Sequence, residues 1–376
     1  MPARHLPLSY TRRCTLKDQD NGAITTLAFS PNGGHLAAGT VDGKLLVWST
    51  SSRKLRFSVC GEAAVLSVAW TSVESSLLCG LEDGTVIAVN YSNILSTDAY
   101  KVHTRPVECL VVSANRVATG AHHQVSIWDY IEGEHWRLVS NLPSPPVIGS
   151  NRDTDAIVTA LHWARTTYSP VTLLVSYRHH GIIFWDVVSE QIAHFFPVGT
   201  VVGSTSLSPD HRFLAVSNQS TGFDVYDLRS NSPVLTLSHD IGSQRSVPVC
   251  FVHNGHALLG GSSIGKICIW DVKSGDLLED LSQNLKDSDA VLAFSAHYDL
   301  KRNKFFIAAA GEGAKHRVHI WETEKIYRKR DIFRLKDSAS RMKLKQNAIT
   351  VCMVFMMVAG LLAAYLLGKR DSRARE

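Results

Sequence analysis

Short runs of alternating apolar and polar residues, separated by turn residues, recur along most of the chain. In the first clear unit, Pro31 and Gly33 end one such run, as expected where a half-buried strand gives way to a turn. Asp42-Gly43 is a hairpin signal, because glycine accepts a positive φ without a steric cost. The pattern of this unit predicts four short antiparallel strands, over residues 24–29, 36–39, 44–48 and 54–59.

The same unit occurs seven times. Its first strand ends in a bulky apolar residue, and successive ones lie 41 to 51 residues apart, at Phe29, Trp70, Val112, Trp163, Leu207, Phe251 and Phe294. Its third strand ends at Trp48, Val89, Trp128, Trp185, Tyr226, Trp270 or Trp321. Four strands in about 44 residues are typical of a propeller blade and not of a helical solenoid repeat. The chain is therefore predicted to be all-β over residues 1–322, as a seven-bladed β-propeller with blades near 23–60, 64–103, 106–140, 156–197, 200–238, 246–282 and 289–322.

The third strands carry a sequence signature. Trp128-Asp129, Trp185-Asp186 and Trp270-Asp271 each end one of them. Over residues 8–321 the chain resembles the WD-repeat family, whose blades are held together by hydrogen-bonded His, Ser or Thr, Asp and Trp. In the third unit this resemblance assigns the structural roles to His103, Thr119 and Trp128, with His-His-Gln at the turn in place of the usual aspartate.

A propeller must close, because a free sheet edge pairs with other chains. Residues 8–16 alternate, with Leu8, Tyr10, Cys14 and Leu16 on one face. We expect them to supply the outermost strand of the last blade. The alternative closing segment is 326–333.

The last part of the chain contains the longest apolar run. Residues 348–367 hold no charged side chain over 20 residues, a length that crosses a bilayer as a helix. We therefore predict a transmembrane helix over 347–368, a basic linker over 323–346 before it, and a short tail over 369–376 after it. No secretory signal precedes the propeller. The expected topology is a single-pass, tail-anchored membrane protein with a cytosolic propeller, in the endoplasmic reticulum membrane, the mitochondrial outer membrane or the peroxisome.

Charge is concentrated beside this segment. The net charge is +5, and many basic residues lie in or near the linker, at Lys325, Arg328, Lys329, Arg330, Arg334, Lys336, Arg341, Lys343 and Lys345. A nucleic-acid groove would instead spread basic residues over a folded face among aromatic side chains, so no nucleic-acid partner is expected. The linker is expected either to lie against anionic lipid headgroups or to be a solvated spacer.

Motifs for chemistry are missing. The seven cysteines are scattered singly, without the paired spacing of zinc or redox sites. No phosphate-binding loop, nucleophile elbow or His-Glu-x-x-His motif occurs. The sequence therefore predicts neither an enzyme nor a cofactor, metal or small-molecule substrate.

Partners are expected on the rim formed by the turns between second and third strands and by the connections between blades. Two histidine pairs lie in such turns of adjacent blades, and together they could bind a metal, make a protonation-sensitive contact, or be ordinary exposed turn residues. Partner binding is expected to concentrate there, on blades 3 and 4. The candidate residues are His103, Arg105, His122, His123, Arg178, His179, His180, Arg245 and Lys315. The proline-rich stretch 141–155 is a second candidate, either as a docking loop or as a tolerated insertion.

These features favour a membrane-anchored scaffold that binds proteins at a membrane surface. Two alternatives rest on resemblance. Seven blades with a C-terminal anchor are similar to the exchange factor that activates a small GTPase in vesicle-coat assembly, although no glycine-rich loop lies between Ile24 and Trp48. Tyr226-Asp227-Leu228-Arg229 resembles the Trp-Asp-x-Arg box through which some propellers join cullin ubiquitin ligases; Tyr226, Asp227 and Arg229 would be its matching positions.

Overall fold

The structure is a computed structural model of the 376-residue chain. It describes residues 9–17, 22–72, 75–92, 94–131, 136–147, 151–166, 171–218, 220–230, 232–240, 247–284, 290–311 and 317–323. The chain divides into two units, Met1–Glu324 and Lys325–Glu376, and every described residue belongs to the first.

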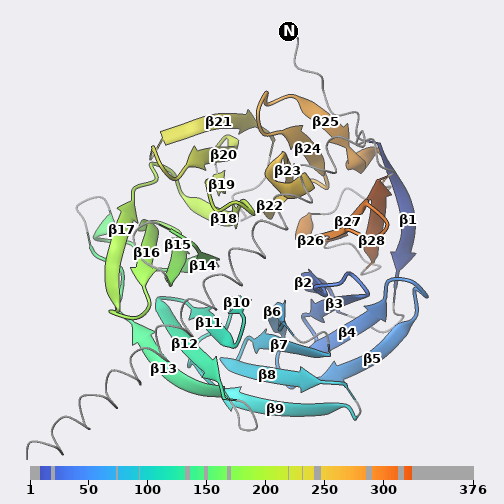
Figure 1. The fold of residues 1–376 in the computed structure, drawn as a ribbon, viewed down its shortest axis with the longest axis horizontal. Coiled ribbons are helices and arrows are strands. Elements are labelled where there is room, and N and C mark those ends of the chain that lie inside the picture. The colour runs from blue at the N-terminus through green and yellow to red at the C-terminus, as the bar shows by residue number, and fades with distance from the viewer. Residues whose placement is uncertain are drawn as a thin grey trace, which may run out of the picture. The chain divides into compact units, whose positions relative to one another are not determined.

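The described residues form seven antiparallel sheets of four strands each, arranged around a central axis (Figure 1). Blade 1 consists of β2 (Ile24–Phe29), β3 (His35–Thr40), β4 (Lys44–Ser49) and β5 (Leu55–Cys60). Blade 2 consists of β6 (Val65–Trp70), β7 (Ser76–Leu81), β8 (Thr85–Asn90) and β9 (Ser96–Lys101). Blade 3 consists of β10 (Cys109–Ser113), β11 (Arg116–Ala121), β12 (Gln124–Tyr130) and β13 (Trp136–Leu142). Blades 4 and 5 are β14 (Val158–Ala164), β15 (Thr172–Tyr177), β16 (Gly181–Asp186) and β17 (Gln191–Phe196); β18 (Val202–Leu207), β19 (Phe213–Asn218), β20 (Gly222–Asp227) and β21 (Ser232–Ser238).

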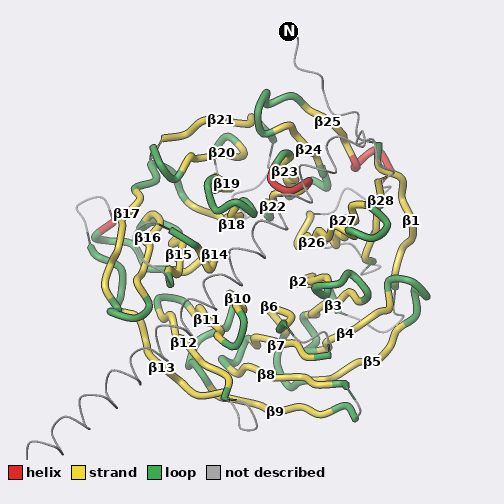
Figure 2. Tube along the Cα trace, viewed as in Figure 1, coloured by secondary structure: helices red, strands yellow, loops and turns green. Residues whose placement is uncertain are grey.

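Blade 6 consists of β22 (Val249–Val252), β23 (Ala257–Gly260), β24 (Cys268–Asp271) and β25 (Leu277–Asp280), with the short 3-10 helices η2 (His253–Gly255) and η3 (Leu281–Asn284). Blade 7 consists of β26 (Val291–Asp299), β27 (Lys304–Gly311), β28 (Val318–Thr323) and β1 (Tyr10–Leu16). The first strand of each blade lies nearest the axis and the last lies outermost, as the tube view shows (Figure 2). The predicted all-β, seven-bladed propeller is confirmed.

The core lies between blades. Each strand alternates, so both faces of every sheet carry apolar side chains, and these meet the neighbouring sheets. One hydrophobic cluster occupies each of the seven seams between neighbouring blades. Trp185 and Trp321, both almost completely buried, fill two of these seams. Because every blade packs against two others, the ring behaves as one rigid body.

The ring has two faces, named here for use below. The connection face carries the turns between second and third strands, residues 41–43, 82–84, 122–123, 178–180, 220–221 and 261–267, and the described segments that join blades, such as 102–108 and 151–157. The exit face carries the opposite turns, among them 30–34, 50–54, 91–95, 114–115, 187–190, 208–212, 272–276 and 300–303. Third strands end at the exit face, so β28 ends there at Thr323.

The N-terminal strand closes the ring. β1 pairs antiparallel with β28 from Tyr10 opposite Thr323 to Leu16 opposite Val318, with one bulge between Arg12 and Cys14. The alternative closing segment, 326–333, lies outside the described residues. Tyr10 also reaches the next blade, where its hydroxyl lies 2.6 Å from Nε2 of His253. The closing strand therefore joins blades 6 and 7.

Burial of His253 predicts acid sensitivity. Only 1% of the residue is exposed, and desolvation lowers the pKa of its imidazole from 6.5 to about 3. The unfolded chain therefore binds a proton first as the pH falls, so the stability from this site is complete above pH 6.5 and is lost between pH 6.5 and 3. From pH 6.5 to 5 the loss is about 2 kcal/mol. Urea unfolding of the full chain in detergent should show this slope; His253→Gln should reduce it, whereas His123→Gln should not.

The predicted membrane helix, 347–368, and the predicted tail, 369–376, lie outside the described residues. Of the predicted linker, 323–346, only residue 323 is described. Within residues 9–323, no helix of the described part has the length and apolar character needed to cross a bilayer.

Candidate partner-binding surface

The seam between blades 2 and 3 is poorer in apolar contacts than the other six. Its cluster has four buried members among the described residues, Leu78, Val86, Val107 and Val117, whereas each other seam has ten or more. Hydrogen bonds supplement the packing here. The hydroxyl of Ser67 in blade 2 donates to the carbonyl of Val107, at 2.7 Å. The seam therefore depends on polar contacts.

His103 is the centre of these contacts. It lies in the segment that joins β9 to β10, and its backbone N–H donates to the carbonyl of Gly84 at 3.0 Å. Its ring atom Nε2 lies 2.9 Å from Thr119 Oγ1, and Nδ1 lies 3.2 Å from Gln124 Oε1. Trp128 Nε1 donates to the same Thr119 hydroxyl at 3.2 Å. Gln124 takes the position that the family resemblance assigns to aspartate.

His103 thus holds two blades together and is not a surface contact. The residue is 5% exposed, and burial lowers the pKa of its imidazole, while the hydrogen bonds to Gln124 and Thr119 act against that shift. A neutral ring with two satisfied nitrogens suits a structural role. The expectation that His103 presents its side chain to a partner is wrong.

A cleft of about 570 Å³ opens on the connection face beside this network. Three segments far apart in sequence line it: 101–104 before β10, 123–126 at the start of β12, and 141–144 at the end of β13. Lys101, Thr104, His123, Asn141 and Ser144 give the cleft exposed polar groups. Val102 and Leu142 add apolar surface. The cleft therefore presents both hydrogen-bonding groups and apolar surface.

The two histidine pairs lie in the turns predicted for them, 122–123 and 178–180, but their side chains differ. His123 and His179 are exposed, and His122 is half-buried with its Nδ1 3.1 Å from Nδ1 of His123. His180 is 3% exposed and packs against Tyr177. Burial lowers the pKa of His180, with His179 as a smaller cause, so its protonation is disfavoured. The expectation that all four are exposed turn residues is therefore wrong for His180.

Glu108 joins the two turns electrostatically. Desolvation raises the pKa of its carboxyl, and the charges of Arg178 and His122 oppose that rise. Arg178 is half-buried, with Nε enclosed and without a hydrogen bond among the described residues. The backbone also connects these blades, because the N–H of Val158 donates to the carbonyl of His122 at 2.8 Å. Blades 3 and 4 therefore meet at the predicted surface.

The remaining candidates are described only in part. Arg105 is exposed, next to the cleft-lining segment 101–104. Arg245 and Lys315 lie outside the described residues, as do the linker residues Lys325, Arg328, Lys329, Arg330, Arg341, Lys343 and Lys345. The proline-rich stretch 141–155 is described except for 148–150, and its first residues form one wall of the cleft.

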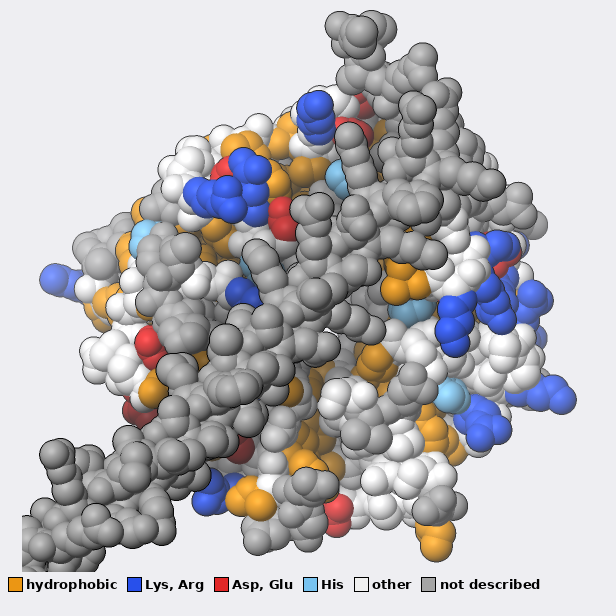
Figure 3. All heavy atoms as spheres, in the orientation of Figure 1, with side chains coloured by type: hydrophobic (Ala, Val, Ile, Leu, Met, Phe, Trp, Pro, Cys, Tyr) orange, Lys and Arg blue, Asp and Glu red, His pale blue; other side chains and the backbone are white. Residues whose placement is uncertain are grey.

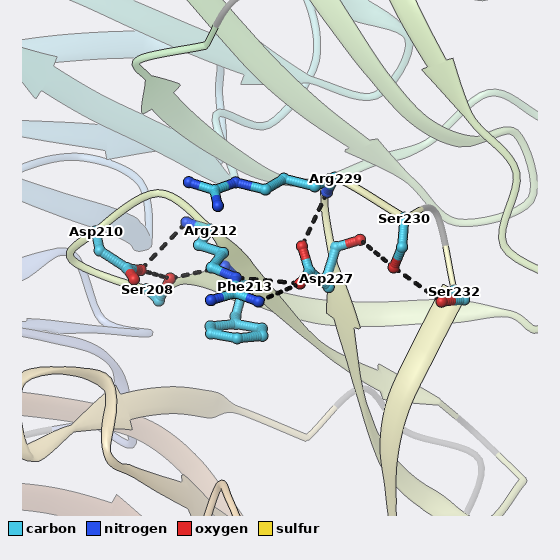
Figure 4. Close-up of polar contacts among 8 residues, drawn as sticks. All are labelled: Ser208, Asp210, Arg212, Phe213, Asp227, Arg229, Ser230 and Ser232. Carbon is cyan, nitrogen blue, oxygen red and sulfur yellow. Dashed lines mark hydrogen bonds and ion pairs between the residues drawn. The ribbon is translucent and has the colours of Figure 1, made fainter.

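The box that begins at Tyr226 lies at the end of β20, on the exit face. Asp227 is buried and accepts hydrogen bonds from Arg212, at 3.1 Å from Nε and 2.8 Å from Nη2. The bond to Arg212 is the largest cause that lowers the pKa of Asp227. Its other oxygen accepts the backbone N–H of Arg229 at 3.0 Å. Asp227 is thus occupied within the blade, while the exposed Arg229 side chain extends away from it (Figure 4).

Among the residues that the structure describes, no three His, Cys, Asp or Glu side chains gather closely enough to hold a metal ion. Cys79, Cys109, Cys250 and Cys268 have thiol pKa values raised by burial, to about 12, 12, 11 and 11. These thiols are small core groups and not nucleophiles.

Comparison with known proteins supports the fold assignment. Residues 11–49 match the family "WD domain, G-beta repeat". The chain is 21% identical to Protein tipD of Dictyostelium discoideum over 73% of its own length and 44% of that protein. It is 23% identical to WD repeat-containing protein 1 of Xenopus tropicalis, over 67% and 49%. It is 30% identical to Set1 complex component swd1 of Schizosaccharomyces pombe, over 23% and 24%.

The chain spans about half the length of the first two of these relatives. Its seven four-stranded sheets, the His103, Thr119 and Trp128 network inside blade 3, and the match to the repeat agree with one another. The chain is a seven-bladed β-propeller that carries a WD repeat over residues 11–49.

Proposed function

We propose that the chain is a membrane-anchored WD-repeat scaffold that binds protein partners on its connection face and holds them at a membrane surface. The observation that carries this proposal is the 570 Å³ cleft beside the His103 network. Its walls come from two blades that are fixed to each other. Binding a segment there costs little conformational entropy in the propeller, because the walls are already ordered.

The kind of relative supports a scaffold. The protein swd1 is described as a component of the Set1 complex, and a subunit of a complex contacts other proteins. We extend this general role to the present chain. An exposed rim of loops on a rigid ring is also where binding residues concentrate in other folds.

The membrane part of the proposal rests on sequence. Residues 348–367 form an uncharged run of 20 residues, long enough for one helix across a bilayer. With the propeller on the cytosolic side, the anchor would concentrate partners at the endoplasmic reticulum, the mitochondrial outer membrane or the peroxisome. The basic linker would lie next to the headgroups.

Blocking the cleft tests the partner site. Ser144 is exposed in the cleft wall, and Ser144→Arg should fill it. Ser113 is a matched control, because it is an exposed serine in a cleft of about 510 Å³ on the exit face. Both changes should alter stability by no more than about 0.5 kcal/mol. In affinity capture of the full chain from membrane extracts, Ser144→Arg should reduce partner recovery at least fivefold, whereas Ser113→Arg should not.

Equal recovery with the two variants would contradict a site in this cleft. Loss with Ser113→Arg alone would move the site to the exit face.

One observation favours a second candidate, a substrate receptor for a cullin-type ligase. Asp227 fixes the backbone of Arg229 and leaves its guanidinium exposed, as a docking arginine requires. Ligase adaptors among the captured proteins, lost on Arg229→Ala and kept on Ser144→Arg, would favour this candidate. Coat GTPases in the capture would favour the exchange-factor alternative.

A further inference from the structure

The exit face combines exposed apolar turn tips with basic side chains. Large apolar residues are exposed in or directly beside turns of five different blades, at Leu55, Ile94, Leu95, Val188, Leu277 and Leu300. The described part of the connection face has three, at Val41, Val147 and Ile264. Leu300 is 70% exposed, at the tip of the turn between β26 and β27. Because these apolar side chains are spread around the ring, they fit the flat interface of a lipid bilayer better than they fit a single ligand.

Basic residues surround two of these tips, on blades 7 and 1. Lys301 and Arg302 follow Leu300, and Arg53 and Lys54 precede Leu55. Figure 3 shows Lys and Arg side chains gathered at the right-hand edge, over the part of the ring where β1 lies in Figure 1. Arg53 lies near enough to β1 for its charge to lower the pKa of Cys14, although burial raises that pKa more. The basic residues of these two turns, which belong to adjacent blades 7 and 1, are called the basic patch below.

Two carboxylates offset part of this charge. Glu322 pairs with Arg13 at 3.1 Å and with Lys304 at 3.2 Å, and Asp299 lies 3.8 Å from Arg302. Lys301, Arg53 and Lys54 form no ion pair with any residue the structure describes. The patch therefore keeps an excess of positive charge that an anionic surface would complement.

The last described strand ends at this face. β28 ends at Thr323, and residues 324–347 separate it from the apolar run. A segment of 24 residues spans at most about 80 Å when fully extended. A propeller attached to the bilayer within that distance meets lipid headgroups at a high effective concentration. Individually weak contacts with the headgroups are then enough to hold one face on the membrane.

We infer that the exit face of the propeller lies on the membrane, with the Leu300 turn entering the interface and the basic residues of blades 7 and 1 contacting anionic lipid headgroups. This inference rests on the proposed anchor and adds an orientation to it. The connection face then points away from the bilayer, toward the partners that its cleft is proposed to bind.

Hydrogen exchange in reconstituted vesicles tests the orientation. The full chain is placed in vesicles of phosphatidylcholine alone or with one-fifth phosphatidylserine. Exchange in the turn 299–303 should slow at least threefold in the anionic vesicles, and the double variant Leu300→Gln, Lys301→Glu should abolish this change. Ile264 and Lys266 give a matched control, because both are exposed in a turn of the connection face. The turn 261–267 should exchange equally in both vesicles, and Ile264→Gln, Lys266→Glu should leave the 299–303 result unchanged.

The failures are distinguishable. A chain that does not float with either vesicle overturns the anchor and this inference together. A chain that floats but exchanges equally at 299–303 in both vesicles overturns the orientation alone. So does protection of that turn only after a protein extract is added, which would make the exit face a protein-binding surface.

Discussion

Deletion of residues 1–16 is expected to remove cooperative unfolding of the propeller. The deletion takes away the outer strand of blade 7 with Tyr10 and Leu16, both buried, and it exposes Trp321 and Val318 on β28. Burial of each large side chain contributes about 1.5–3 kcal/mol, so the loss is at least about 5 kcal/mol. A typical domain has only about 5–15 kcal/mol in total. Near-UV circular dichroism during heating would record the loss of the sharp transition.

A peptide supplied in trans controls for this deletion. A synthetic peptide of residues 9–17 should restore the transition, whereas the same peptide with Asp at positions 10 and 16 should not. If the deleted chain unfolds at the temperature of the full chain, β1 does not close the ring.

Replacement of Gly84 by alanine is expected to cost about 3 kcal/mol or more. Gly84 has φ +89°, and a Cβ there would lie 2.1 Å from the carbonyl oxygen of His103. A left-handed alanine alone costs about 1–3 kcal/mol, and the contact with backbone adds to this because the neighbouring atom cannot rotate away. His103 would have to move, which opens the seam between blades 2 and 3 and distorts the cleft.

Gly61 provides the matched control in the same ring. A Cβ on Gly61 would meet its nearest atoms at 3.5–3.7 Å, an ordinary contact distance. Gly61→Ala should therefore be neutral or slightly stabilising, by up to about 1 kcal/mol. The comparison is made by chemical unfolding of both variants. Equal midpoints would mean that the turn at Gly84 is not constrained by His103.

The fold could be predicted because its signals are local. The alternation of residues 24–29, the Asp42-Gly43 turn and the seven bulky strand ends each depend on a few neighbours in sequence. β1 closes the ring where residues 8–16 were predicted to do so, but the prediction that Tyr10, Cys14 and Leu16 share one face is wrong. The bulge between Arg12 and Cys14 reverses the alternation, so Tyr10 packs toward blade 6 whereas Leu16 packs toward blade 1. His103, Thr119 and Trp128 occupy the positions that the family resemblance gave them.

The site was less predictable, because burial and clefts depend on distant segments. His179 and His180 are neighbours in one turn, yet only His180 is buried, against Tyr177. The cleft combines 101–104, 123–126 and 141–144, and no single segment marks it in the sequence. The local signals that did point to its walls were His103, His123 and the proline-rich stretch that begins at residue 141. Asp227 pairs with Arg212 inside the blade. Antiparallel pairing brings them together, because it puts Phe213, the neighbour of Arg212, opposite Asp227.

Photo-crosslinking from the two faces tests whether the connection face binds proteins while the exit face lies on the membrane. Benzoylphenylalanine is placed at position 123, which is exposed in the cleft, or at position 300, which is exposed on the exit face, in the full chain in cells. We expect protein crosslinks from position 123, and Ser144→Arg should remove them. From position 300 we expect crosslinks to lipid but none to protein. Protein crosslinks from position 300 together with none from position 123 would contradict both expectations.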